Sequence, residues 1–60
     1  MVNIKEIYHI FIDTGFVPNN IINMIAVKII NKNPLSEMEM SIFYGKTDEI
    51  NQEIIRISKK

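Results

Sequence analysis

Cysteine and tryptophan are absent from this chain of 60 residues, and glycine and proline occur only twice each. Without cysteine, neither disulfides nor thiolate metal sites are available to stabilise so small a protein. The few helix-breaking residues therefore stand out as boundaries. They lie at Gly15 and Pro18, at Pro34 and at Gly45, and they divide the chain into four short segments.

The chain also has no excess of charge of either sign: seven basic and seven acidic residues give a formal net charge of zero. Modules that bind duplex DNA, and helices that lie on anionic membranes, usually carry a basic stripe, so this balance disfavours both. The longest uncharged run, residues 14–27, is too short to span a bilayer. Lys5 and Glu6 stand where a secretory signal needs an apolar stretch. We expect a cytoplasmic protein.

Apolar residues, by contrast, are abundant: they make up 47% of the chain and include fourteen isoleucines and four methionines. A domain of about 60 residues buries only about 60% of the surface that its unfolded chain exposes. We therefore expect part of this apolar surface to be covered by a second copy or by another protein. The frequent isoleucine, asparagine and lysine residues have AT-rich codons, which would fit a phage or another mobile element.

The spacing of apolar residues between the boundaries is helical. In the first segment, for example, Ile4, Ile7, Tyr8 and Phe11 recur at i, i+3, i+4 and i+7. The sequence predicts an all-α fold, a compact bundle forming a single domain over residues 1–60. Its four short helices are expected at about residues 3–13, 18–31, 36–44 and 47–58.

The most apolar of these segments is expected to be the central helix. Its predicted buried face consists of Ile21, Ile22, Ile25, Ile29 and Ile30. The inward stripes of the last two helices are predicted at Leu35, Met38 and Ile42, and at Ile50, Ile54 and Ile57.

Local capping residues support the first two helices. Asn3 is suited to cap the start of the first helix, and Gly15 to adopt the left-handed conformation that ends it. Pro18 is suited to the first turn of the second helix.

The starts of the third and fourth helices also carry capping residues. Ser36 and Glu39 have the spacing of a capping box. Thr47 is predicted to cap the fourth helix, with Asp48 and Glu49 in its first turn.

One group of residues has the spacing of a metal half-site. Glu6, His9 and Asp13 share one face of the first predicted helix, and Glu-x-x-His resembles the half-site of helical di-iron bundles. A second copy would supply the other half, and Glu53 could offer further carboxylates. The alternative is a solvated face on which His9 pairs with Asp13 one turn away. We favour that alternative and predict neither a metal nor another cofactor.

Two short matches to enzyme motifs are better explained as the ends of helices. Asp13-Thr14-Gly15 resembles the active-site signature of aspartic proteases, but the match covers three residues and lacks the second glycine-rich element of that family. Residues 45–47 read Gly-Lys-Thr, like the tail of a phosphate-binding loop, but Met40 occupies the position of its required glycine. The sequence therefore predicts a protein that is not an enzyme.

Four apolar residues are predicted to lie outside the buried stripes and to bind a partner: Met24, Val27, Met40 and Tyr44. Methionine adapts its shape and is frequent at recognition surfaces. The sequence thus favours a small non-enzymatic protein-interaction module, a homodimer that binds a protein partner as its regulator or inhibitor.

The alternative function is a small dimeric DNA-binding regulator resembling helix-turn-helix proteins. The last predicted helix carries three side chains that can contact bases, Asn51, Gln52 and Arg56. Acidic residues on the same helix, among them Asp48 and Glu49, would repel phosphate near its start. Nucleic acid is therefore the less favoured partner.

Overall fold

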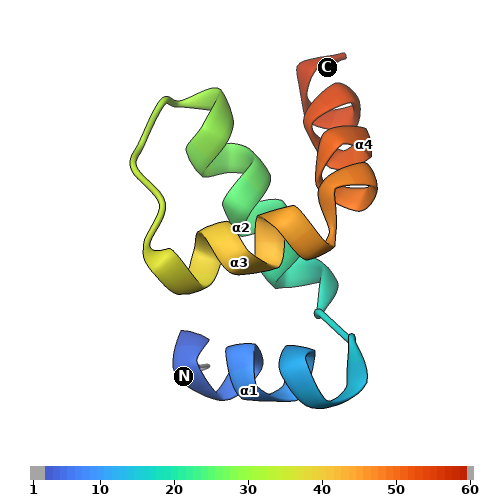
Figure 1. Cartoon of the computed structure of the whole chain (residues 1–60). Coiled ribbons are helices and arrows are strands. Elements are labelled where there is room, and N and C mark those ends of the chain that lie inside the picture. Colours follow the sequence, from blue (N-terminus) through green and yellow to red (C-terminus); the bar gives the residue numbers. More distant parts are fainter. Residues whose placement is uncertain (1–2, 60) are drawn as a thin grey trace.

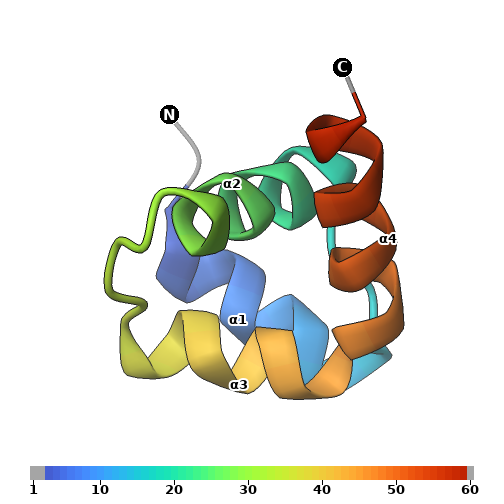
Figure 2. The ribbon, with the colours of Figure 1, turned by 90° about the horizontal axis from the view of Figure 1, so that it is seen from above.

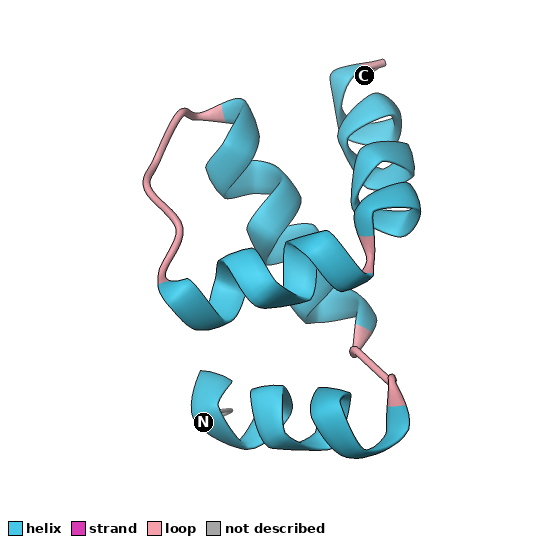
Figure 3. Ribbon diagram, in the orientation of Figure 1, coloured by secondary structure: helices cyan, strands magenta, loops and turns pink. Residues whose placement is uncertain are grey.

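The computed structural model describes residues 3–59, and within this range the chain forms four α-helices and no strand (Figure 1; Figure 3). The helices are α1 (Ile4–Thr14), α2 (Asn19–Ile30), α3 (Glu37–Gly45) and α4 (Thr47–Ser58). Each begins and ends within one residue of its predicted bounds. The all-α prediction is therefore confirmed.

The ends of α1 are set by the predicted local hydrogen bonds. At the start, Asn3 Oδ1 accepts a hydrogen bond from the Lys5 amide at 2.9 Å. At the end, Gly15 has a φ of 75°, and its amide donates to the Phe11 carbonyl at 2.8 Å. Glycine adopts this left-handed conformation without the strain that a Cβ atom adds, so the backbone favours glycine at position 15.

The start of α3 is closed by the predicted capping box. Ser36 Oγ accepts a hydrogen bond from the Glu39 amide at 3.2 Å, and Glu39 Oε1 accepts one from the Ser36 amide at 2.9 Å. Pro18, in contrast, lies just before α2 rather than in its first turn, with a φ of −61° and a ψ of 149°.

The prediction that Thr47 caps α4 is wrong. Only Lys46 separates α3 from α4, so Thr47 is already the first helical residue. Its hydroxyl donates back to the last turn of α3, to the Phe43 carbonyl at 2.8 Å and the Tyr44 carbonyl at 3.2 Å. Thr47 therefore secures the end of α3 instead of the start of α4.

The helices pack mainly in two pairs. α1 lies alongside α3 and runs in the same direction, while α2 packs against α4 (Figure 1). Seen from above, α4 lies beside both α2 and α3, and α1 lies beneath them (Figure 2). The chain bends by 113° between α1 and α2, which brings the two pairs together.

The core between these pairs is built mainly by α2, as predicted. Ile25 of α2, Ile42 of α3 and Ile50 of α4 are fully buried. The complete buried apolar set is Ile7, Val17, Ile21, Ile22, Ile25, Ala26, Ile42 and Ile50.

The buried face of α2 is rotated slightly from the predicted one. Ile30 is 38% exposed, Ile29 is only half-buried, and Ala26 is fully buried in their place. The side chains that face α4 include Asn23, which donates a hydrogen bond to Glu53. Ala26 lies three residues after Asn23 and therefore on the same side of α2. The apolar spacing of the sequence did not predict that this side of α2 would be covered by α4.

Candidate protein-interaction surface

Two of the four predicted partner-binding residues share the outward side of α3. Met40 is 40% exposed and Tyr44 is 74% exposed. They lie four residues apart, so their side chains neighbour each other on the helix surface. The fully buried Ile42 lies between them in sequence and points the opposite way. The structure thus brings Met40 and Tyr44 together, away from the core.

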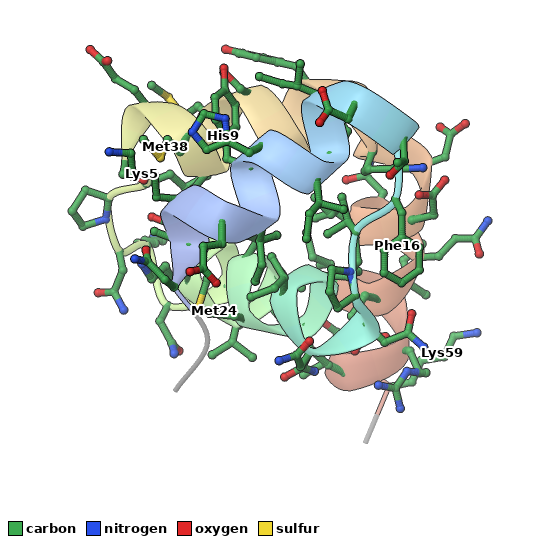
Figure 4. The ribbon with its side chains drawn as sticks, turned by 90° about the horizontal axis from the view of Figure 1, so that it is seen from below. Lys5, His9, Phe16, Met24, Met38 and Lys59 are labelled. Carbon is green, nitrogen blue, oxygen red and sulfur yellow. The ribbon has the colours of Figure 1, made fainter. Side chains whose placement is uncertain are left out.

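The other two predicted residues, Met24 and Val27, lie on α2 and differ from each other in exposure. Val27 is 37% exposed. Met24, expected to be exposed, is half-buried and packs against the core cluster, and Figure 4 places it on α2, away from the start of α3. Met24 directly precedes Ile25, so it lies only about 100° around the helix from a fully buried position. It is a border residue of the core.

Residues of α1 extend the exposed surface of α3. The Phe11 ring packs directly over the Cα of Gly45, so the ends of these two parallel helices are in close contact. Ile12, which follows Phe11, is 59% exposed. The sequence offered a signal for Ile12, because it is a large apolar residue outside the inward stripe of its helix, but it was not among the predicted residues.

Stripes of the two helices form one face on the side away from the core. On α1 the exposed Lys5 and Ile12 are seven residues apart, and on α3 so are Glu37 and Tyr44, with Met40 between them. The buried Ile7 and Ile42 point inward from the same helices. Figure 4 shows α1 from below, with Lys5 near its start and His9 further along the helix. We call this surface the α1–α3 face and define it by its exposed residues, Lys5, Ile12, Glu37, Met40 and Tyr44.

Opposite charges stand at one end of the α1–α3 face. Lys5 and Glu37 are exposed, and within residues 3–59 neither of them forms an ion pair. The exposed apolar groups, Ile12 and Tyr44, stand toward the other end. The face therefore has a polar end and an apolar end.

A buried ion pair holds the opposite side of α3 to α2. The Lys28 ammonium donates to Glu39 Oε2 at 2.7 Å, while Oε1 of the same carboxylate belongs to the capping box. The Glu39 side chain is almost completely buried, whereas Lys28 remains partly exposed. Glu39 thus serves both the start of α3 and the α2–α3 connection, and it keeps the outward side of α3 in place.

Burial raises the pKa of the Glu39 carboxyl, but the opposing contacts outweigh this effect. Hydrogen bonds from Lys28 and from the amide and hydroxyl of Ser36, with the charge of the ammonium, lower the pKa below the ordinary value of 4.5. A carboxyl whose pKa is lower in the folded state stabilises the fold above its unfolded-state pKa. This stabilisation is lost as the pH falls through the folded-state pKa.

We therefore expect the free energy of unfolding to fall with pH below about 4.5, and to fall less steeply in the Glu39→Gln variant. Urea unfolding between neutral pH and about pH 3 measures both slopes. Glu6→Gln, an exposed glutamate in the first turn of α1 and outside the face defined above, is the matched control and should keep the wild-type slope. Equal slopes for wild type and Glu39→Gln would show that this carboxylate does not stabilise the fold.

A second polar cluster joins α2 to α4. Asn23 Nδ2 donates to Glu53 Oε2 at 2.8 Å, and Arg56 holds both oxygens of the same carboxylate at 2.8 and 2.6 Å. The hydrogen bonds from Arg56 to Glu53, and the charge of Glu53, raise the pKa of the Arg56 guanidinium. The guanidinium is thus engaged by a carboxylate of its own helix.

The residues of the metal hypothesis lie on exposed positions of α1. Glu6, His9 and Asp13 are all exposed, and no three metal-ligating side chains cluster among the residues that the structure describes. Next to them, the Thr14 hydroxyl donates to the Ile10 carbonyl at 2.8 Å and accepts from the Phe16 amide at 3.2 Å. Residues 13–15 therefore form the end of a helix, as the sequence analysis favoured.

Comparison of the chain with protein-family models, with curated proteins and with solved structures finds no match. No pocket is present in the described part of the chain. Over the same residues no single helix is long and apolar enough to cross a membrane, although α1 and α2, bent at their junction, together pass by length and composition.

Proposed function

We propose that this chain is a small non-enzymatic protein-interaction module that associates with itself and binds a protein partner, which it regulates or inhibits. The exposure of Tyr44 and Met40 on one side of α3, and of Ile12 on the neighbouring α1, carries this proposal. Tyrosine is enriched among residues that dominate binding energies, and methionine is common at adaptable recognition surfaces. Clustered exposed apolar side chains are typical of binding surfaces.

The support of the face by the fold is consistent with this function. The inner side of α3 carries the buried Ile42 and the Glu39 carboxylate that pairs with Lys28, so Met40 and Tyr44 extend from a helix that is fixed to the core and to α2. A preorganised surface loses less conformational entropy when it binds. Apolar contacts would then supply most of the affinity.

The DNA-binding alternative finds less support in the arrangement of α4. Asn51 and Gln52 are exposed and available to bases, but Asp48 and Glu49 are exposed in the first turn of the same helix. Arg56 is held by the Glu53 carboxylate. A DNA-binding surface here would have to overcome acidic charge and break this pairing.

Capture of the partner from the native host tests the proposal through its dependence on salt and on Tyr44. We expect capture to persist between about 0.1 M and about 1 M salt, because apolar contacts are not screened. Tyr44→Asp should weaken capture by about tenfold or more, since it places a charge in the apolar part of the face. Ile55→Asp is the matched control: Ile55 is 54% exposed on α4, outside the α1–α3 face, and its replacement should leave capture unchanged.

Circular dichroism of each variant checks that helicity is kept. Met24→Asp is unsuitable as a binding test, because Met24 packs against the core and its replacement would also disturb folding. Sequence-selective binding to duplex DNA at physiological salt, lost in Arg56→Ala and kept in Tyr44→Asp, would refute the proposed function in favour of a DNA-binding regulator.

A further inference from the structure

We propose that a second copy of this chain covers the α1–α3 face, with a two-fold axis that runs between the copies along the direction of α1 and α3. This inference rests on the proposed function for the importance of the face. It adds that a second copy occupies the face until the protein partner displaces it, and it gives the orientation of that copy. It is carried by the matching of the two helices in residue pattern, level and charge.

The residue pattern is the first step. On α1 an exposed lysine, Lys5, is followed seven residues later by an exposed isoleucine, Ile12. On α3 an exposed glutamate, Glu37, is followed seven residues later by an exposed tyrosine, Tyr44. On the α1–α3 face each helix therefore presents one charge and, two turns further on, one large apolar group, and the two charges are opposite in sign.

The level of the two helices is the second step. The contact of Phe11 with Gly45 aligns the parallel helices with an offset of 34 residues. With this offset, Lys5 is level with Glu39, two residues beyond Glu37. Ile12 is in the same way two residues beyond the level of Tyr44. Two residues correspond to about 3 Å along a helix, so the charged ends and the apolar ends of the stripes nearly coincide.

The symmetry operation is the third step. Rotation by 180° about an axis along the helices keeps their direction and exchanges their positions, so that α1 of one copy faces α3 of the other at the same level. Lys5 then faces Glu37 of the partner subunit, and Ile12 faces Tyr44 of the partner subunit. Every contact of such an interface occurs twice, which doubles the effect of each complementary pair.

The charge of the chain is the fourth step. Because the formal net charge is zero, two copies approach without overall repulsion. Within one copy, both Lys5 and Glu37 are without an ion pair among the described residues. A second copy would give each of them a partner of opposite sign at the edge of an apolar contact.

The test is a charge exchange followed by sedimentation equilibrium at tens of micromolar. Wild type should sediment as a species heavier than the 7.0 kDa monomer. Lys5→Glu places two glutamates opposite two glutamates, and Glu37→Lys places two lysines opposite two lysines. For each variant alone, the dissociation constant of the dimer should therefore rise about tenfold or more, because like charges face each other twice. An equimolar mixture of the two variants should form heterodimers again, since every facing pair is then of opposite sign.

Two matched isoleucines test the apolar end of the interface. Ile12 and Ile55 are similarly exposed, and each lies in the last turns of its helix, so aspartate disturbs either helix to a similar degree. Ile12→Asp should abolish association, and Ile55→Asp should leave it unchanged. Circular dichroism is the check that both variants remain helical.

The outcomes separate this inference from the proposed function. A wild-type chain that stays monomeric at these concentrations, or a dimer that dissociates in Ile55→Asp but not in Ile12→Asp, overturns the inference. So does a mixture of the two charge variants that associates no better than each variant alone. If Tyr44→Asp still abolishes capture of another protein in those cases, the proposed protein-binding function survives and only the second copy as occupant is rejected.

Discussion

Replacement of Ile25 by alanine is expected to lower the free energy of unfolding by about 2–5 kcal/mol, because it leaves a cavity at a position with no exposed surface. Ile25 lies at the middle of α2, the helix that contributes most of the buried side chains. The total stability of small domains is about 5–15 kcal/mol, so this single change removes a large part of it. Chemical denaturation followed by circular dichroism measures the loss.

Ile30→Ala is the matched control, since Ile30 lies on the same helix and is 38% exposed. Its replacement should cost much less. Both proteins must be compared at equal and low concentration, because self-association would add a concentration-dependent term to the stability. If Ile25→Ala and Ile30→Ala unfold at the same denaturant concentration, α2 does not form the centre of the fold.

Replacement of Gly45 by alanine is expected to destabilise the protein by up to about 2 kcal/mol. An overpacking cost of about 1–3 kcal/mol is partly offset, because alanine is more favourable than glycine in a helix by about 1 kcal/mol. Gly45 is the last residue of α3, and a Cβ atom there would overlap the Phe11 ring. The ring packs against the core, so moving it separates the ends of α1 and α3. The same change should weaken self-association, because the Phe11–Gly45 contact sets the level of the two stripes.

A double-mutant cycle with Phe11→Leu isolates this steric effect. The shorter side chain should remove the overlap, so that Gly45→Ala costs less stability in the Phe11→Leu background. Gly15→Ala provides a contrast: a Cβ at Gly15 meets no neighbouring atom, and its cost of about 1–2 kcal/mol comes from the positive φ alone. A Gly45→Ala variant more stable than wild type, with no coupling to Phe11, would contradict the close helix contact.

Helix boundaries and most of the inward stripes were predictable because they depend on neighbours in sequence, although the predicted Ile30 is exposed and Met38 is not part of the core cluster. The Asn3 cap, the left-handed Gly15 and the Ser36–Glu39 capping box each satisfy backbone groups within a few residues. Thr47 shows the limit of this reasoning. Its residue type suits a cap, but the single-residue connection between α3 and α4 directs its hydroxyl back to α3.

The candidate site was predicted in part. Met40 and Tyr44 were expected to be exposed on α3, and both are. Their combination with Ile12 of α1 depends on which helix lies beside α3, a fact that no local pattern contains. The second copy as occupant depends further on the relative level of two helices that are separated by α2 in the chain.

The sequence by itself determined that this protein is helical, where its helices begin and end, and that apolar residues exceed what so small a core can cover. These properties follow from hydrogen bonds, apolar spacing and composition, which act over a few residues or over the chain as a whole. Only the tertiary structure decided that Ala26 is buried while Ile30 is exposed, that Glu39 pairs with Lys28, and that Gly45 must leave room for Phe11. These outcomes depend on which helix faces which, and that is set by packing between residues far apart in the sequence.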